Sequence, residues 1–314
     1  MKLELPTPAT PMKIGTRGSP LALVQAREVR QRLMRAFGLP NQAFEIVAIS
    51  TTGDRVQDRP LSELGGKGLF TREIEDELAA GSIDIAVHSM KDMPTKQPAG
   101  LVLDCYLARQ DVRDALVSFS VTSLEALSKG AVVGTSSLRR KAQVLLRRPD
   151  LRVVEFRGNV QTRLRKLKDG VAQATFLAMA GLNRLGLADV PYVAIDADNM
   201  LPAVAQGAIG IERRGDDHRV AEMLAAVHHG PTATRLAAER AYLSELDGSC
   251  QTPIAGLAEL DGGSLRFRAE ILRTDGSEAL SDEQSGPFED AAEIGRAVAA
   301  GLLARAGAHF FDWR

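Results

Sequence analysis

The sequence predicts an α/β protein with two similar α/β lobes, followed by a third, smaller α+β domain. Strand-like and helix-like segments alternate from Met12 to Gly134, the alternation begins again at Ala131, and the pattern changes after Gly230. The chain of 314 residues also exceeds the length at which a single hydrophobic core keeps growing. More than one domain is therefore expected.

The first lobe begins with a short strand at Met12–Gly15. Ser19 is a natural N-cap and Pro20 fits the first helical position, so a helix is expected from there to about Ala36. The apolar spacing then predicts a strand at residues 44–50, a helix at 69–80 and a strand at 83–87. This order is typical of a largely parallel sheet.

The second lobe repeats the same order of elements. A strand at residues 131–134 precedes a helix that is capped by Ser136 or Ser137 and runs through Arg147. A strand at 153–156, a helix from the cap Asn159 to about Lys168, and a strand at 174–177 follow. The repetition predicts a second lobe with the architecture of the first.

The third domain is expected to combine helices with a β-hairpin. A helix at residues 233–246 precedes two strands, 254–260 and 265–272, which turn at Asp261-Gly262-Gly263. A last helix is expected at 288–306. At the other end of the chain, residues 1–11 are rich in proline and threonine and are expected to be a disordered lead.

Composition excludes several classes of protein. A net charge of −1 argues against a general nucleic-acid binder, and no run of 18 or more apolar residues is present to span a membrane. Two cysteines are too few for a disulfide scaffold, which favours a reducing, cytoplasmic location. Five scattered histidines without paired Cys/His spacing predict no metal site.

Arginines recur where loops lead into predicted helices. The chain has 30 arginines and 9 lysines, and Arg17, Arg139, Arg140 and Arg163 lie at three such junctions. A cation beside a helix N-terminus opposes the helix dipole at a cost of about 0.3–1 kcal/mol, whereas a bound anion reverses the sign. We therefore predict anion binding, with phosphate and carboxylate both open; salt-bridged surface arginines and a GC-rich genome are the alternatives.

A carboxylate and a cysteine are the candidate reactive groups. Asp92 follows the strand 83–87 beside Lys91, at the sheet edge where open α/β sheets bind ligands. There it can stabilise developing positive charge, although a turn aspartate is the alternative. Cys250 lies in a helix-to-strand loop and is a candidate nucleophile, whereas Cys105 in an apolar strand is expected to be buried and inert.

Eight motifs, in order over residues 12–258, together resemble the porphobilinogen deaminase family. They are Thr16-Arg17-Gly18-Ser19-Pro20-Leu21-Ala22-Leu23, Lys67-Gly68-Leu69-Phe70, His88-Ser89-Met90-Lys91-Asp92-Met93-Pro94, Gly134-Thr135-Ser136-Ser137-Leu138-Arg139-Arg140, Arg157-Gly158-Asn159-Val160-Gln161-Thr162-Arg163-Leu164, Ala180-Gly181-Leu182-Asn183-Arg184-Leu185-Gly186, Leu201-Pro202-Ala203-Val204-Ala205-Gln206-Gly207 and Gly248-Ser249-Cys250-Gln251-Thr252-Pro253-Ile254. Ala205, Ser249 and Gln173 depart from the residues that the family commonly shows there.

This resemblance implies a three-domain transferase whose two lobes are similar to periplasmic binding proteins. The implied domains are residues 12–108 with about 208–226, 109–207, and 230–314. A dipyrromethane cofactor would be linked through a thioether to Cys250. Four porphobilinogen molecules would be added in turn, each losing ammonia, before hydrolysis releases hydroxymethylbilane for haem biosynthesis. The resemblance also implies a monomer without nucleic-acid or membrane partners.

The resemblance also assigns roles to individual residues. Asp92 would be catalytic, and residues 51–64 would form a mobile lid. The implied cofactor-binding residues are Cys250 (covalent), Lys91, Ser137, Arg139, Arg140, Arg163, Arg184 and Gln206. The implied substrate-binding residues are Arg17, Ser19, Lys67, Phe70, Arg157 and Arg163. A non-catalytic two-lobed anion-binding protein is the alternative, but it leaves the third domain and the Cys250 motif unexplained.

Overall fold

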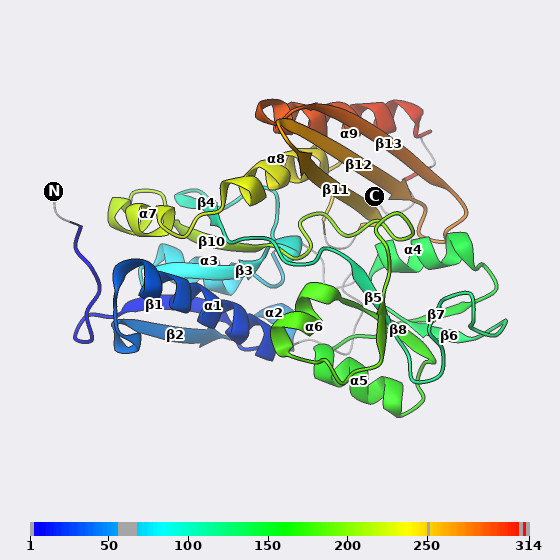
Figure 1. Ribbon diagram of the computed structural model, residues 1–314, viewed down its shortest axis with the longest axis horizontal. Helices are drawn as coiled ribbons and strands as arrows, with labels where there is room; N and C mark the ends of the chain where they lie inside the picture. The colour runs from blue at the N-terminus through cyan, green and yellow to red at the C-terminus, as the bar shows by residue number, and fades with distance from the viewer. Residues whose placement is uncertain (1–2, 56–67, 250–251, 308–309, 312–314) are drawn as a thin grey trace. The chain divides into compact units, whose positions relative to one another are not determined.

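The computed structural model describes residues 3–55, 68–249, 252–307 and 310–311 (Figure 1). These residues form two compact units. The first contains residues 3–55, 68–110 and 208–233, and the second contains the described residues of 111–207 and 234–311. In the part of the chain that is described, no helix is both long and apolar enough to cross a membrane.

The first unit is built on a five-stranded sheet with the strand order β2-β1-β3-β10-β4. Its strands are β1 (Met12–Arg17), β2 (Phe44–Ile49), β3 (Ile85–Ser89), β4 (Leu101–Tyr106) and β10 (Ile209–Arg214). Strand β1 pairs parallel with β2 and β3, whereas β10 pairs antiparallel with β3 and β4. Only β10 therefore runs against the other strands, and the sheet is largely parallel.

The helices of the first unit are α1 (Pro20–Phe37), α2 (Thr52–Arg55), α3 (Arg72–Ala79) and α7 (His218–Ala225), with 3-10 helices at Asn41–Ala43 and Met90–Asp92. Ser19 caps α1 as predicted, since its hydroxyl accepts a hydrogen bond from the Ala22 amide at 3.3 Å. Helix α3 begins three residues later than expected because Gly68, at φ 92°, holds a turn before it.

The core of this unit lies between α1, α7 and the sheet. Ala26, Val29 and Leu33 of α1 are fully buried, and they belong to the same apolar cluster as buried residues of β1, β3 and β10. Leu3 and Leu5 also pack against this cluster, in contrast to the disordered lead expected from the sequence. Their apolar side chains gain more from burial than a purely polar lead would.

The second unit contains a sheet with the same pattern of strand directions, in the order β7-β6-β8-β5-β9. Its strands are β5 (Asp114–Val117), β6 (Val132–Gly134), β7 (Arg152–Val154), β8 (Ala174–Ala178) and β9 (Tyr192–Ala194). Strand β6 pairs parallel with β7 and β8, and β5 pairs antiparallel with β8 and β9. The prediction of two similar α/β lobes is thereby confirmed.

Three helices accompany this second sheet: α4 (Leu138–Arg147), α5 (Val160–Lys168) and α6 (Met179–Leu185). Ser137 caps α4 and Asn159 caps α5, by accepting hydrogen bonds from the amides of Arg140 at 3.4 Å and Thr162 at 2.9 Å. Both caps were predicted, and Ser137 rather than Ser136 is the cap of α4. The cap fixes where the first turn of α4, with its two arginines, begins.

The remainder of the second unit is an antiparallel sheet with the order β11-β12-β13. Helix α8 (Gly230–Glu245), of which residues 234–245 belong to this unit, precedes the sheet. The elements that follow are β11 (Ile254–Asp261), β12 (Ser264–Leu272), β13 (Ala279–Pro287), a 3-10 helix at Phe288–Asp290, and α9 (Ala291–Arg305), which lies along the sheet in Figure 1. The predicted hairpin turn at residues 261–263 joins β11 to β12. The α+β character of this part is confirmed, although β13 was not predicted.

Candidate active site

A small pocket of the first unit brings together five residues that the sequence singled out. Its volume is about 80 Å³, and Arg17, Ser19, Phe70, Lys91 and Asp92 are among its lining residues. They come from three places: the junction of β1 and α1, the turn before α3, and the 3-10 helix after β3. Strands β1 and β3 are parallel neighbours, so their carboxyl ends meet at one edge of the sheet.

Arg17 is the central cation of this pocket. Its Nη1 lies 4.0 Å from Oδ2 of Asp92, and its guanidinium carbon lies 4.2 Å from the centre of the Phe70 ring. Its Nε donates to Oδ2 of Asp54 at 3.1 Å, and its Nη2 donates to Oδ1 of the same carboxylate. Arg17 therefore lies between two carboxylates, one of which the sequence had singled out.

Asp54, at the end of a short helix, is the carboxylate that sequence reasoning missed. Burial alone would raise the pKa of Asp54, but the hydrogen bonds and charge of Arg17, with a hydrogen bond from Thr51, hold that pKa below its usual value. The Thr51 hydroxyl donates to Oδ2 at 2.8 Å. Asp54 is thus an ionised partner that occupies the Nε and Nη2 donors of Arg17.

Two other residues of the first unit, a histidine and a cysteine, have structural roles. His88 is buried in β3, and its Nε2 lies 3.1 Å from Oε2 of the fully buried Glu212. Cys105 is buried in β4, and burial raises the pKa of its thiol to about 12. A thiol with such a pKa is protonated at neutral pH, in agreement with the inert role expected from the sequence.

In the second unit, three predicted residues converge on one buried carboxylate, Asp114. Arg139 Nη2 donates to its Oδ2 at 2.7 Å, Arg140 Nη2 donates to its Oδ1 at 2.6 Å, and Gln206 Nε2 donates to the same Oδ1 at 2.9 Å. Burial would raise the pKa of Asp114, but the charges of Arg139 and Arg140 and the hydrogen bonds outweigh it and lower that pKa. Asp114 was not predicted; an aspartate opening the otherwise apolar β5 is the signal that could have revealed it.

The other predicted residues of this unit belong to the same α/β lobe as Asp114. Arg163 Nε donates to the carbonyl of Gly158 at 2.9 Å, beside the buried Arg157, and Arg184 Nη2 donates to the carbonyl of Gly207 at 3.1 Å. Ser137 serves as the cap of α4. Lys67, Cys250 and residues 56–64 of the expected lid lie outside the described residues.

The donors of this lobe fit a ligand that carries carboxylates. Arginine side chains present only donors, in a planar fork that matches a carboxylate. Among the residues described, the buried Nε atoms of Arg139 and Arg140 have no hydrogen-bond partner, so the pair is not saturated by Asp114. No group of histidine, cysteine, aspartate and glutamate suited to a metal ion occurs among the described residues.

Two family models match this chain. Residues 12–222 match "Porphobilinogen deaminase, dipyromethane cofactor binding domain", and residues 233–304 match "Porphobilinogen deaminase, C-terminal domain". The chain belongs to the porphobilinogen deaminase family. A porphobilinogen deaminase from Paracoccus denitrificans (strain Pd 1222) is 65% identical over 310 residues, which cover 99% of each chain.

Solved structures of periplasmic proteins are also similar in fold to this porphobilinogen deaminase family member. A periplasmic substrate-binding protein from Coxiella burnetii is 17% identical and matches 73% of this chain and 96% of its own, with a TM-score of 0.41. The periplasmic VFT2 domain of BvgS from Bordetella pertussis is 16% identical and matches 73% of this chain and 91% of its own, with a TM-score of 0.41.

The family confirms several predictions made from the eight motifs. The protein is a transferase, a hydroxymethylbilane synthase, and dipyrromethane is its cofactor. The alternative of a non-catalytic two-lobed anion-binding protein is not favoured, because the third domain matches a model of the same enzyme family.

Proposed function

We propose that the chain divides its work between two sets of residues: Arg17, Phe70 and Asp92 act on porphobilinogen, while the arginines of the second unit hold carboxylates. The observation that carries this proposal is the arrangement around Arg17. A guanidinium lies over an aromatic ring and 4.0 Å from the Asp92 carboxylate, inside one pocket. A cation, a carboxylate and a ring are the groups that a charged pyrrole substrate needs.

Asp92 is proposed to meet positive charge. When ammonia leaves porphobilinogen, the pyrrole that remains is cationic, and a fixed carboxylate stabilises such a charge as it develops. Its oxygens also accept hydrogen bonds, which a pyrrole N–H can donate. The chemistry that bound dipyrromethane supplies is a pyrrole carbon able to attack an electrophile.

Arg17 and Phe70 are proposed to hold and orient the substrate. Porphobilinogen carries an acetate and a propionate, each of which an arginine can bind through two parallel hydrogen bonds. The Phe70 ring under the guanidinium restricts its orientation, and aromatic rings stack favourably with one another. Ser19 and Lys91, which line the same pocket, supply further donors.

The arginines of the second unit are proposed to bind the carboxylates of the cofactor and the growing product. Arg139 and Arg140 are fixed on Asp114, so little conformational freedom is lost when a carboxylate arrives. Arg157, Arg163 and Arg184 add donors from the same lobe. Because each added pyrrole brings further acids, repeated positive charge is needed along the product.

The anchor is proposed to be Cys250, through a thioether. That role requires a free thiol, which supports a cytoplasmic location, where thiols stay reduced.

We also propose a division into three domains: residues 12–108 with about 208–226, residues 109–207, and residues 230–314. The protein is proposed to be a monomer without a nucleic-acid partner, and the net charge of −1 supports the last point.

The anchor is tested by intact-mass measurement of Cys250→Ser, with Cys105→Ser as the matched control. The wild type and Cys105→Ser should weigh more than the bare polypeptide by two porphobilinogen units less two ammonias. Cys250→Ser should fold, carry no added mass and turn over no porphobilinogen. An unchanged mass increment in Cys250→Ser would assign the cofactor to another residue.

A further inference from the structure

A buried glutamine connects the third-domain sheet to the arginine pair. Gln143, in the middle of α4, is 1% exposed. Its Oε1 accepts a hydrogen bond from Arg139 Nη1 at 2.9 Å, and its Nε2 donates to Oε2 of Glu270 in β12 at 2.9 Å. Its Nε2 also donates to the carbonyl of Leu201 at 3.1 Å. Every polar atom of this side chain therefore has a partner.

The two charged neighbours fix the orientation of the Gln143 amide. Arginine can only donate and an ionised carboxylate can only accept, so the amide oxygen must face Arg139 and the amide nitrogen must face Glu270. An uncharged amide supplies both an acceptor and a donor at this position. Glu270, together with the Leu201 carbonyl, thus holds the amide nitrogen and keeps the amide oxygen toward Arg139.

Hydrogen bonds connect the Gln143 amide through Arg139 to Asp114 and Arg140. Arg139 Nη1 is shared between Gln143 and the carbonyl of Leu201 at 2.9 Å, and Nη2 is held by Asp114. Asp114 in turn holds Arg140 and Gln206. A continuous set of hydrogen bonds therefore leads from β12 to the groups proposed to bind carboxylates.

Backbone packing fixes the same two elements against each other. Gly276, in the turn between β12 and β13, has a φ of 73°. A Cβ atom there would lie 2.6 Å from the Leu146 amide nitrogen and 2.8 Å from the Ala142 carbonyl oxygen, both in α4. The β12–β13 turn therefore packs directly against the α4 backbone at Ala142 and Leu146, which flank Gln143 in the helix. This contact is independent of the hydrogen bonds.

We propose that Gln143 and Glu270 are positioning residues, through which the third domain sets the orientation of Arg139 for carboxylate binding. The inference rests on the proposed function of the arginine pair. Neither residue touches substrate; both act through Arg139. A side chain that positions a remote carboxylate-binding arginine affects the ground state and the transition state alike, so its loss raises KM more than it lowers kcat.

The test uses the full-length protein and a reversal of hydrogen-bond polarity. Gln143→Glu places two carboxylates at hydrogen-bond distance and should raise the KM for porphobilinogen about tenfold, the size of one charge-assisted hydrogen bond. The fraction of chains that carry cofactor, measured by intact mass, should fall as well.

The double variant Gln143→Glu/Glu270→Gln restores the alternation of donor and acceptor. The new carboxylate at position 143 can then accept from both Arg139 and the new amide at position 270. It still faces the Leu201 carbonyl, to which the wild-type amide donates, so KM and cofactor content should recover in part, with KM at least about threefold below that of Gln143→Glu. Glu270→Gln alone should be mild, because its amide oxygen still accepts from Gln143. Gln161→Glu, the same change at an exposed position of α5, is the matched control and should alter neither value.

If Gln143→Glu does not fold, Glu270→Ala removes the same Gln143–Glu270 hydrogen bond from the side of Glu270. Glu270 is only half-buried, so truncation there should be tolerated while KM still rises; Glu278→Ala, exposed in the same hairpin, is its control. An unchanged KM in the folded single variants, or no recovery in the double variant, overturns the proposal. Arg139→Lys distinguishes a failure of this inference from a failure of the proposed function. If Arg139→Lys also leaves KM and cofactor content unchanged, the arginine pair does not bind carboxylates as proposed.

Discussion

Arg17 shows how one side chain serves two carboxylates. Its guanidinium donates to Asp54 and lies 4.0 Å from Asp92, while its face covers Phe70. Asp54 belongs to the chain itself, yet it presents to Arg17 the same group that the acetate or propionate of a substrate would present. A substrate carboxylate must therefore compete with Asp54 for these donors.

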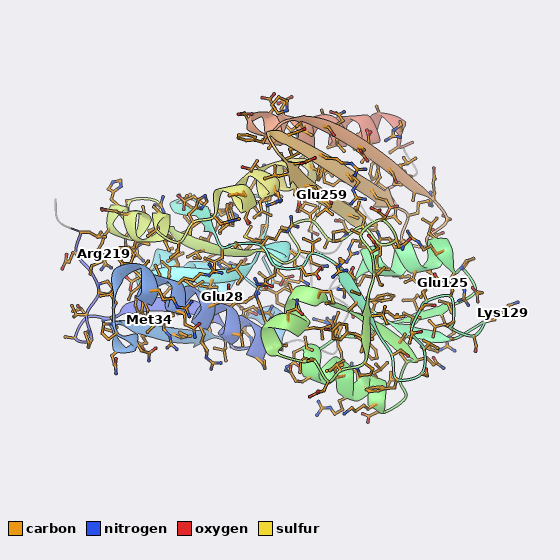
Figure 2. All side chains as sticks on the ribbon, in the orientation of Figure 1. Glu28, Met34, Glu125, Lys129, Arg219 and Glu259 are labelled. Atoms are coloured by element: carbon orange, nitrogen blue, oxygen red, sulfur yellow. The ribbon has the colours of Figure 1, made fainter. Side chains whose placement is uncertain are left out.

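Replacing Asp54 by asparagine should weaken that competition. The amide keeps the shape of the side chain but removes the charge that pairs with Arg17, so the KM for porphobilinogen should fall by about two- to fivefold, the range of a partly exposed ion pair. Steady-state kinetics measures this change. Glu28→Gln, which removes the carboxylate partner of Arg32 on α1 (Figure 2), is the control and should leave KM unchanged. A higher KM in Asp54→Asn would show that Asp54 supports substrate binding.

Ala205 carries backbone strain next to Gln206. Its φ is 62°, in the left-handed region that favours glycine, and its amide donates to Oε2 of Glu239 at 2.6 Å. The other oxygen of Glu239 accepts from the amide of Ala258 in β11 at 2.9 Å. A buried carboxylate thus holds the turn that presents Gln206 to Asp114.

Glycine at position 205 should relieve the strain. We expect Ala205→Gly to raise the free energy of unfolding by up to about 1 kcal/mol, since the left-handed penalty exceeds the added backbone entropy of glycine. Urea unfolding of both proteins checks the value. Ala203→Gly, in the same segment but without a positive φ, should instead destabilise; equal effects of the two changes would argue against strain at residue 205.

At the scale of elements, the sequence predicted best what depends on local chemistry. The caps Ser19, Ser137 and Asn159 were found because a cap needs only its own side chain and the next turn of helix. Strand β13 was missed because most of its residues are polar and exposed, and its partner β12 alone defines it. The start of α3 shifted because the φ of Gly68 was not readable from the sequence.

Helix α3 and strand β10 each carry a buried glutamate. Glu75 and Glu212 are both buried, and Glu212 is bound to His88. Burial raises the pKa of Glu75, and the charge of Glu212 raises it further. The folded protein therefore keeps a proton on Glu75 at pH values at which the unfolded chain has released it.

This shift predicts a pH-dependent cost in stability. Above the ordinary pKa of 4.5, the folded state binds more protons at Glu75 than the unfolded state does, so the free energy of unfolding falls as pH rises through the raised pKa. Glu75→Gln removes this effect, and its stability should decline less than that of the wild type as pH rises above 4.5. Urea unfolding at each pH, with Glu77→Gln as the control at an exposed position of α3, checks it. Parallel pH profiles for wild type and Glu75→Gln would contradict the expectation.

At the scale of the whole molecule, the sequence motifs located residues but not their partners. The motifs led to Arg17, Phe70 and Asp92 in one pocket, and to Arg139, Arg140 and Gln206 on one carboxylate. Asp54, Asp114, Gln143 and Glu270 were missed, because their roles arise from tertiary contacts. Gln143 and Glu270 are 127 residues apart in the chain, so no local pattern could join them.

The proposed reaction depends on the negative charge that Asp92 supplies. Asp92→Asn keeps the size of the side chain and one acceptor oxygen, removes the negative charge, and replaces the second oxygen by an NH2 donor. Binding through Arg17 and the arginine pair should therefore survive, whereas the step in which ammonia leaves should not. Asp92→Glu, which keeps the charge but moves it, should fall between the wild type and Asp92→Asn.

Single-turnover mass measurement tests this most directly. Cofactor-bearing chains are mixed with one equivalent of porphobilinogen, quenched at set times, and followed by the gain of one pyrrole unit in intact mass. In Asp92→Asn this gain should be slower by about 100- to 1000-fold, as when a preorganised electrostatic group is removed. Addition at the wild-type rate by Asp92→Asn chains would contradict the account.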